Sequence, residues 1–138
     1  MKQIQRFSSA VLVTLALSLS SLPLVYSLPE GENVLSGSAT FDRGTPSTLN
    51  ISTSSDRLIV DYNGFSIAQN EAVHFNQPSS SSIALNRVVG QDPSSILGTL
   101  TANGRIFIVN PNGVIFGAGS HPSIDGDSLF VVLNAGFF

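Results

Sequence analysis

The sequence contains no cysteine, and only 11% of its 138 residues are charged. Without cysteine the chain cannot form a disulfide scaffold or a thiolate site for zinc or an iron–sulfur cluster. Six basic and nine acidic residues give a net charge of -3, so there is no basic surface typical of nucleic-acid binding. With two histidines, His74 and His121, we expect no metal site and no cofactor.

The low charge is unusual, because soluble domains average about 25% charged residues. Low charge combined with many Ser, Asn and Gly residues can indicate disorder. Here 42% of the residues are hydrophobic, and the many Val, Ile and Leu residues favour a folded chain rich in β-strands. The length is that of one domain.

The first 27 residues have the pattern of a signal peptide. Lys2 and Arg6 precede an uncharged stretch whose apolar core, residues 10–19, has ten residues. A membrane span needs about 20 residues, so this run fits the hydrophobic region of a cleaved export signal better. Val25 and Ser27 occupy positions that signal peptidase accepts, which predicts cleavage between Ser27 and Leu28.

The pattern predicts two parts of the chain, a signal peptide, residues 1–27, and a mature domain, residues 28–138. It also implies the Sec machinery and signal peptidase as partners. A membrane anchor that stays attached is the alternative, but Pro23 and the serines near it interrupt a longer helix. Cleavage would leave four arginines against nine carboxylates, a net charge of -5, and no lysine.

The sequence pattern of the mature domain predicts an all-β fold. No stretch after residue 27 sustains a helical period, whereas short β-branched and aromatic runs recur between turn residues. The expected strands are residues 58–62, 65–67, 72–75, 83–85, 96–100, 105–109, 114–116 and 129–133.

Two features bear on how these strands are arranged. In the run RIFIV, residues 105–109, the residues after the arginine are apolar at both even and odd positions. This pattern predicts burial on both faces of the strand. Asn-Gly recurs at 103–104 and 112–113, each pair followed by a short strand. Asn-Gly suits a tight hairpin, and it equally suits the corners of a stacked solenoid. The residues alone leave a β-sandwich or hairpin meander and a β-solenoid open.

Residues 103–119, NGRIFIVNPNGVIFGAG, resemble the hallmark segment of the N-terminal secretion domain of the filamentous haemagglutinin family of two-partner-secretion exoproteins. The NPNG-hydrophobic motif is matched at Asn110, Pro111, Asn112, Gly113 and Val114. Other blocks agree in order: LPEGENVLSGSATF at the mature start, YNGFSI at 62–67, FNQP at 75–78, ALNRV at 84–88 and DPSSILG at 92–98. The resemblance covers residues 28 to 126.

The resemblance implies a right-handed parallel β-helix with N-terminal capping strands. It also implies Sec-dependent export through the periplasm and passage across the outer membrane through a dedicated β-barrel transporter with periplasmic docking domains. On this fold Asn63-Gly64 becomes a corner rather than a hairpin turn. Few charges and no cysteine suit a chain that crosses unfolded.

The NPNG corner, Asn110 to Gly113, is the candidate site, and two roles stay open for it. In the structural role, Asn tolerates left-handed backbone and its amide bonds the local main chain, Pro111 presets its φ, and Gly113 accepts a positive φ. In the other role, the periplasmic domains of the transporter read the corner. Asn76, Gln77, Pro78, Asn86 and Arg87 are further family-block positions.

No catalytic constellation is evident, and we expect no enzyme. No G-x-S-x-G elbow is present. His74 reads as an exposed strand position, and His121 lies in a polar loop. Asp125 and Asp127 are too few ligands for calcium. The serine tract at 79–82 reads as a solvated loop, and the sequon at Asn50 as chance.

Two functional classes remain. The chain is the export module of a large secreted or cell-surface adhesin, with host or cell-surface receptor binding in a downstream region. Alternatively it is itself a small β-helix module for adhesion or glycan binding, or a non-functional gene fragment. The end of the sequence, with FVVLNAGFF at 130–138, departs from the family and predicts an incomplete β-helix with an apolar, aggregation-prone edge.

Overall fold

A computed structural model describes residues 27–124 and 130–133 of the chain. Within these residues all regular structure is strand, and none of it is a helix long and apolar enough to cross a membrane. The signal peptide through Tyr26, the Asp125 and Asp127 pair and the terminal NAGFF beyond Leu133 lie outside the described residues.

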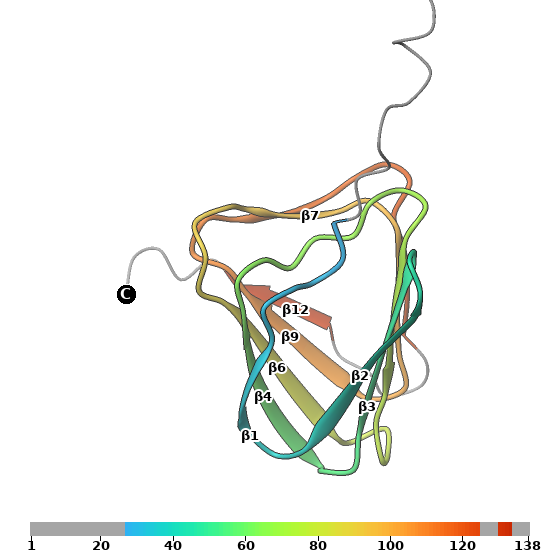
Figure 1. Cartoon of the computed structure of the whole chain (residues 1–138), viewed down its shortest axis with the longest axis vertical. Helices are drawn as coiled ribbons and strands as arrows, with labels where there is room; N and C mark the ends of the chain where they lie inside the picture. Colours follow the sequence, from blue (N-terminus) through green and yellow to red (C-terminus); the bar gives the residue numbers. More distant parts are fainter. Residues whose placement is uncertain (1–26, 125–129, 134–138) are drawn as a thin grey trace, which may run out of the picture.

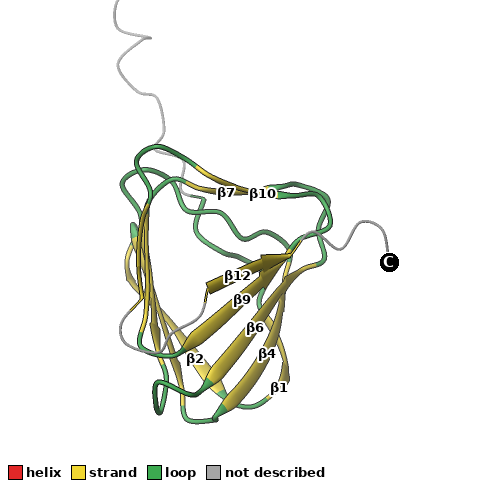
Figure 2. Ribbon diagram, turned by 180° about the vertical axis from the view of Figure 1, so that it is seen from behind, coloured by secondary structure: helices red, strands yellow, loops and turns green. Residues whose placement is uncertain are grey.

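The strands stack into three sheets that enclose a roughly triangular cross-section (Figure 1). One five-stranded sheet has the order β1-β4-β6-β9-β12, the other β11-β8-β5-β3-β2, and β10 pairs with β7 in the two-stranded sheet (Figure 2). The bounds are β1 Asn33–Ser36, β2 Ala39–Thr45, β3 Thr48–Thr53, β4 Arg57–Tyr62, β5 Ala72–Asn76, β6 Ile83–Val88, β7 Ser94–Ile96, β8 Thr99–Ala102, β9 Arg105–Val109, β10 Val114–Phe116, β11 His121–Ile124 and β12 Phe130–Leu133.

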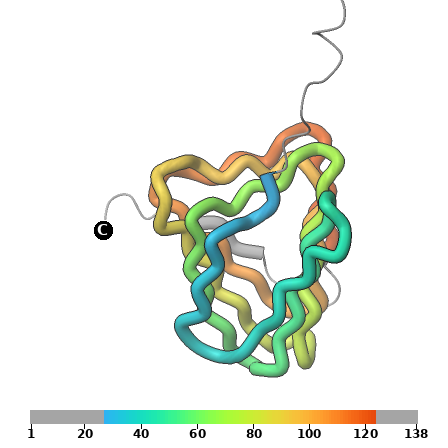
Figure 3. Tube along the Cα trace, in the orientation of Figure 1, coloured from blue at the N-terminus to red at the C-terminus, as the bar shows by residue number. Residues whose placement is uncertain are grey.

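All pairings among β3 to β12 are parallel, and each strand lies on the one from the preceding turn. The Cα trace in Figure 3 follows this coil for about three turns. In one sheet Leu58, Ala84 and Ile106 occupy equivalent positions on successive turns. The parallel β-helix implied by the NPNG resemblance is confirmed, and the sandwich and hairpin alternatives are wrong.

The first two strands run against the coil and extend two of its sheets. β1 pairs antiparallel with β4, and β2 pairs antiparallel with β3. Side chains of Val34, Ala39 and Phe41 pack on the end of the core, where the Phe41 ring meets the edge of Tyr62 at 6.5 Å between centroids. These strands cover the core at the start of the coil, as expected of capping strands.

The core is built by alternation along each strand. From β3 to β9, inward residues are buried and outward residues half-buried or exposed, so that β4 places Leu58, Val60 and Tyr62 inside. Burial of each large apolar side chain contributes about 1.5–3 kcal/mol. The run RIFIV follows the same rule: Ile106 and Ile108 are fully buried, whereas Phe107 and Val109 are half-buried. The prediction of burial on both faces was therefore wrong.

Several strands differ from the sequence-based expectation. Residues 65–67 form no strand, and only Ile67 makes an isolated parallel bridge, to Ile96. The expected strand 96–100 is two strands divided at Gly98, where an added Cβ would come within 2.4 Å of the Glu71 main-chain oxygen. That close approach turns the chain from one sheet into the next. β3 and β11 were not expected.

The Asn-Gly pairs do not form hairpins. β4 pairs with β1 and β6 rather than with β5, so Asn63-Gly64 is a corner, as expected. Among the described residues a positive φ occurs at Gly31, Gly37 and Gly113, and at no residue other than glycine. The expectation for Gly113 is confirmed, at φ 108°, whereas left-handed backbone at Asn110 or Asn112 was wrong.

Candidate functional site

Asn110 is fully buried at the end of β9, where it joins two turns of the coil. Its Nδ2 donates to the main-chain oxygen of Asp92 at 3.0 Å and to Ser94 Oγ at 2.9 Å. Its Oδ1 accepts from the main-chain N–H of Asn112 at 2.9 Å. The side chain thus joins its own corner, through Asn112, to the corner of the preceding turn, through Asp92 and Ser94.

The next three residues close the turn and face outward. The Gly113 N–H donates to the Asn110 main-chain oxygen at 3.1 Å, and the Gly113 oxygen accepts from the N–H of Ser94 at 2.9 Å. Pro111 and Asn112 are exposed. Asn112 Nδ2 reaches Gly90 O at 3.0 Å, so this side chain also bridges the two corners.

An apolar side chain extends the exposed surface of the corner. Ile115 follows in β10 and is 57% exposed. We call Pro111, Asn112 and Ile115 the corner edge. Since Asn110 is buried, the corner can be contacted by another protein through the corner edge and not through Asn110.

A second inter-turn lock is formed by Gln77, which is 6% exposed. Its Nε2 donates to the main-chain oxygens of Ser82 and Arg105, both at 3.2 Å, and its Oε1 accepts from the N–H of Gly104 at 3.0 Å. The Asn103 amide in turn bonds the Gln77 main chain. The FNQP segment at 75–78 and the TANG segment at 101–104 therefore contact each other across two turns, through Gln77, Asn103 and Gly104.

The remaining family-block positions have different surroundings. Asn76 and Pro78 are exposed. Asn86 is fully buried in β6, where its Nδ2 donates to Phe107 O at 3.3 Å, while its Oδ1 has no partner among the described residues.

Arg87 lies on the outer face of the same strand and forms an ion pair with Asp61. Arg87 Nε lies 2.7 Å from Asp61 Oδ1. The hydrogen bond from Arg87 lowers the pKa of Asp61, against a smaller opposing effect of burial, and raises the pKa of the Arg87 guanidinium. This pair is a surface contact between two turns.

The predicted cleavage site, Ser27 and Leu28, lies at the N-terminal end of the described residues. Ser27 N–H donates to Glu71 Oε1 at 2.7 Å, and Leu28 packs against the core. No sequence motif indicates this contact with Glu71.

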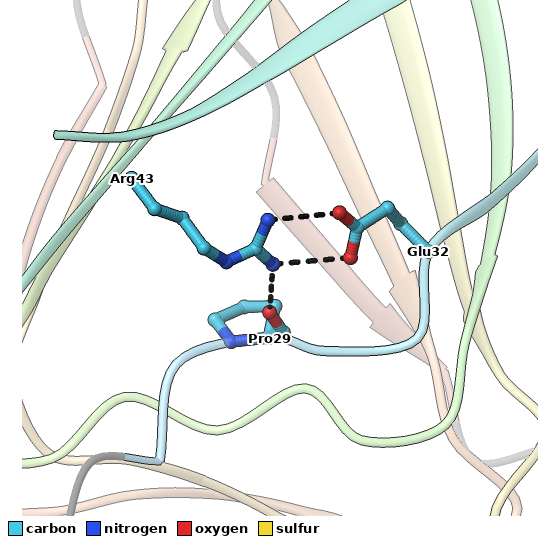
Figure 4. Close-up of polar contacts among 3 residues, drawn as sticks. All are labelled: Pro29, Glu32 and Arg43. Atoms are coloured by element: carbon cyan, nitrogen blue, oxygen red, sulfur yellow. Dashed lines mark hydrogen bonds and ion pairs between the residues drawn. The ribbon is translucent and has the colours of Figure 1, made fainter. Parts of the chain in front are cut away.

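Arg43 of β2 anchors the same segment through Pro29 and Glu32 (Figure 4). Its guanidinium binds Glu32 with bonds of 2.8 and 3.0 Å and Pro29 O at 2.6 Å. Burial raises the pKa of Glu32, but hydrogen bonds from Arg43 and the main chain outweigh it, so the pKa is lowered.

The residues considered for catalysis are dispersed. His74 is half-buried, with Nδ1 2.6 Å from Thr101 Oγ1, so its predicted exposure was wrong. His121 is exposed in β11 rather than in a polar loop. In the part of the chain that the structure describes, no three His, Cys, Asp or Glu side chains form a potential metal site.

The serine tract is only partly the solvated loop that we expected. Ser79, Ser80 and Ser81 are exposed, but Ser82 is 1% exposed and donates from Oγ to Asp56 Oδ1 at 3.1 Å. Ser94, which supports Asn110, is likewise fully buried. Both serines lie directly before or at the start of a strand, and that position is the only sequence signal for them.

Comparison with known proteins connects this geometry to a family. A family model described as the TPS secretion domain matches residues 29–133. A heme/hemopexin-binding protein of Haemophilus influenzae is 37% identical over 98 residues, and that of strain ATCC 51907 / DSM 11121 / KW20 / Rd is 40% identical over 108 residues. The alignments cover 71% and 72% of this chain and 11% of each relative.

A solved structure gives the same result for the fold. The crystal structure of the HMW1 secretion domain from Haemophilus influenzae superposes with a TM-score of 0.70 and 32% sequence identity. The match covers 77% of this chain and 27% of that structure. The chain thus spans a small part of the length of the proteins it matches.

Proposed function

Because this chain belongs to the TPS secretion domain family, we propose that it directs a two-partner-secretion exoprotein to a dedicated outer-membrane β-barrel transporter. The match of the family model to residues 29–133 is the observation that carries this proposal. The cargo is a filamentous haemagglutinin-like adhesin whose receptor-binding activity lies outside the described β-helix. The domain acts by being recognised and transported, and it catalyses no reaction.

The proposed route begins with the signal peptide. The Sec machinery delivers the chain to the periplasm, signal peptidase cuts between Ser27 and Leu28, and the transporter moves the chain to the cell surface or the medium. A chain without cysteine forms no disulfide that would block passage in an extended state. Folding of the β-helix outside the cell then follows turn by turn, each turn burying its apolar face on the one before.

We assign the two parts of the NPNG corner different roles. Asn110 builds the corner, because its amide is buried and bonded to both turns. The corner edge is read by the periplasmic docking domains of the transporter, because it is exposed next to a rigidly held turn. Asn76, Gln77, Pro78, Asn86 and Arg87 maintain the fold and its surface rather than touch the transporter.

Secretion dependent on the transporter tests the function. The chain is expressed in cells with the transporter, without it, and with a transporter that lacks its periplasmic docking domains. The medium and the periplasm are then assayed for the processed chain. The proposal requires extracellular chain only with the intact transporter. Equal release from all three cells would contradict it, and would favour an independent secreted module instead.

A further inference from the structure

Glu71 is a buried acidic residue for which the export route gives no reason. Its side chain is 4% exposed at the start of the second turn of the coil. The main chain fixes its position, because the Glu71 N–H donates to Ala68 O and the Glu71 oxygen accepts from Thr99 N–H, both at 3.0 Å. These bonds hold Glu71 at the junction between two turns, where its carboxylate is buried.

Three neutral groups donate to this carboxylate. Ala68 N–H reaches Oε2 at 2.8 Å, Ser27 N–H reaches Oε1 at 2.7 Å, and Ser27 Oγ lies 3.1 Å from Oε2. Within residues 27–124 no arginine or histidine forms an ion pair with it. Burying a carboxylate without a cation is costly. As long as only these neutral donors face it, the negative charge of Glu71 has no counter-ion among the described residues.

Removal of the signal peptide changes this donor set. Cleavage between Ser27 and Leu28 takes away both Ser27 donors and leaves the carboxylate with the Ala68 N–H alone. The same cut turns the Leu28 nitrogen into an ammonium group, and successive main-chain nitrogens lie only about 3–4 Å apart. The new cation thus arises beside the carboxylate that loses its donors.

The surroundings hold Leu28 at this place. Its side chain packs on the core, and the next residue, Pro29, is bonded through its oxygen to Arg43. A cavity of about 250 Å³ borders Ser27 and Leu28, with the acidic Glu30 and Asp92 in its wall. The guanidinium of Arg43 is already neutralised by Glu32, so the net field of these groups favours a cation.

We propose that Glu71 is the counter-ion of the N-terminal ammonium that signal-peptide cleavage creates at Leu28. The proposal rests on the processing step of the proposed function. The ion pair ties the start of the mature chain to the second turn, so the N-terminal end of the β-helix closes fully only after processing. The uncut precursor has a neutral amide in this position and lacks that ion pair.

The sequence offers a clean probe of this contact. Its one lysine is Lys2, so the α-amine is the only primary amine of a chain that starts at Leu28. An acylating reagent for amines then reports on that group alone. The folded 28–138 chain, prepared with Leu28 as its first residue, is labelled as a function of pH beside Glu71→Gln and the matched control Glu30→Gln, which removes an exposed carboxylate near the same cavity.

The ion pair raises the pKa of the α-amine above its ordinary value of about 7.7–8.0 and so keeps it unreactive. Only the unprotonated amine reacts. At a pH below both the ordinary and the raised pKa, each unit by which the pKa rises slows labelling about tenfold. We expect Glu71→Gln to label about tenfold faster than the unchanged chain and Glu30→Gln to remain close to it. Equal rates in the unchanged chain and Glu71→Gln overturn the proposal.

A second arm needs no substitution at Glu71. The unchanged chain is acetylated while unfolded, refolded, and melted beside the untreated chain. A lower melting temperature after acetylation supports the ion pair, and an unchanged one overturns it.

Failure of this inference is separable from failure of the proposed function. Transporter-dependent release of a chain with an unprotected amine rejects the ion pair alone. A protected amine on a chain that the transporter does not release rejects the function alone.

Discussion

The side-chain amide of Asn103 clasps the main chain of Gln77 across two turns of the β-helix. The Gln77 N–H donates to Asn103 Oδ1 at 2.7 Å, and Asn103 Nδ2 donates to the Gln77 oxygen at 2.8 Å. The two residues are 26 positions apart, so neither motif shows this contact by itself. Amide side chains at corners thus hold successive turns in register.

Replacing Asn103 by Ala removes both bonds of this clasp. Two main-chain groups of Gln77 lose their partners, and we expect the free energy of unfolding to fall by about 1–3 kcal/mol. The neighbouring Asn76→Ala is the control, because Asn76 is exposed and makes one long bond, of 3.4 Å to Ser52. Urea unfolding of both variants measures the difference, and equal midpoints would show that the clasp contributes nothing.

Asn110→Ala should destabilise the fold more than Asn112→Ala. The first variant leaves the oxygen of Asp92 and the hydroxyl of Ser94 without their donor inside the protein, at a cost of about 2–3 kcal/mol. The second loses the bonds from Asn112 Nδ2 to Gly90 O and Asn110 Oδ1 at an exposed position, where water replaces them, at about 0.5–1 kcal/mol. Thermal melting followed by circular dichroism ranks the two, and the reverse order would refute the structural role of Asn110.

Tyr62→Phe should keep or raise stability. The ring packs against Phe65 at 5.2 Å between centroids, while the fully buried hydroxyl has no partner among the described residues. Burial raises the pKa of this phenol. Removing an unpartnered hydroxyl relieves a desolvation cost of about 1 kcal/mol. A lower unfolding midpoint for Tyr62→Phe than for the unchanged chain would mean that the hydroxyl has a bound partner, such as water.

Acid should weaken the two ion pairs. The pKa values of Asp61 and Glu32 are lowered in the folded chain, so the stability they contribute is present above the unfolded pKa of about 4 and is lost as the pH falls through the folded values. Exposed pairs contribute about 0.2–1 kcal/mol each. Arg87→Gln should therefore flatten the decline in unfolding free energy between pH 5 and pH 2, and an unchanged slope would contradict the assignment.

The strands that could be predicted from the sequence are those marked by a short run of apolar, β-branched residues between turn residues. Runs such as 58–62 and 105–109 combine several β-branched residues and lie between turn residues, and Gly113 has the positive φ that its turn requires. β3 was overlooked because only Leu49 and Ile51 of its inward residues are strongly apolar, between polar Thr, Asn and Ser.

Contacts between turns could not be predicted in this way. The burial of Glu71, Ser82 and Ser94 depends on residues 16 to 44 positions away, and a polar residue gives no periodic signal of its own. The NPNG resemblance supplied the fold, while the division of the motif into a buried Asn110 and an exposed corner edge required the structure.

A matched pair of double variants tests whether the transporter recognises the corner edge. Asn112→Ala/Ile115→Ser alters the edge, and Asn33→Ala/Leu35→Ser makes the same changes at exposed positions of β1, where Leu35 is 50% exposed. The measurement is the secreted fraction in cells with the transporter, beside the melting temperature of each purified chain. We predict that the edge variant alone is secreted less, because its docking affinity falls about tenfold, equal to 1.4 kcal/mol. Its melting temperature should drop by no more than corresponds to the small loss of stability expected for Asn112→Ala. Equal secretion of the two variants would contradict the account.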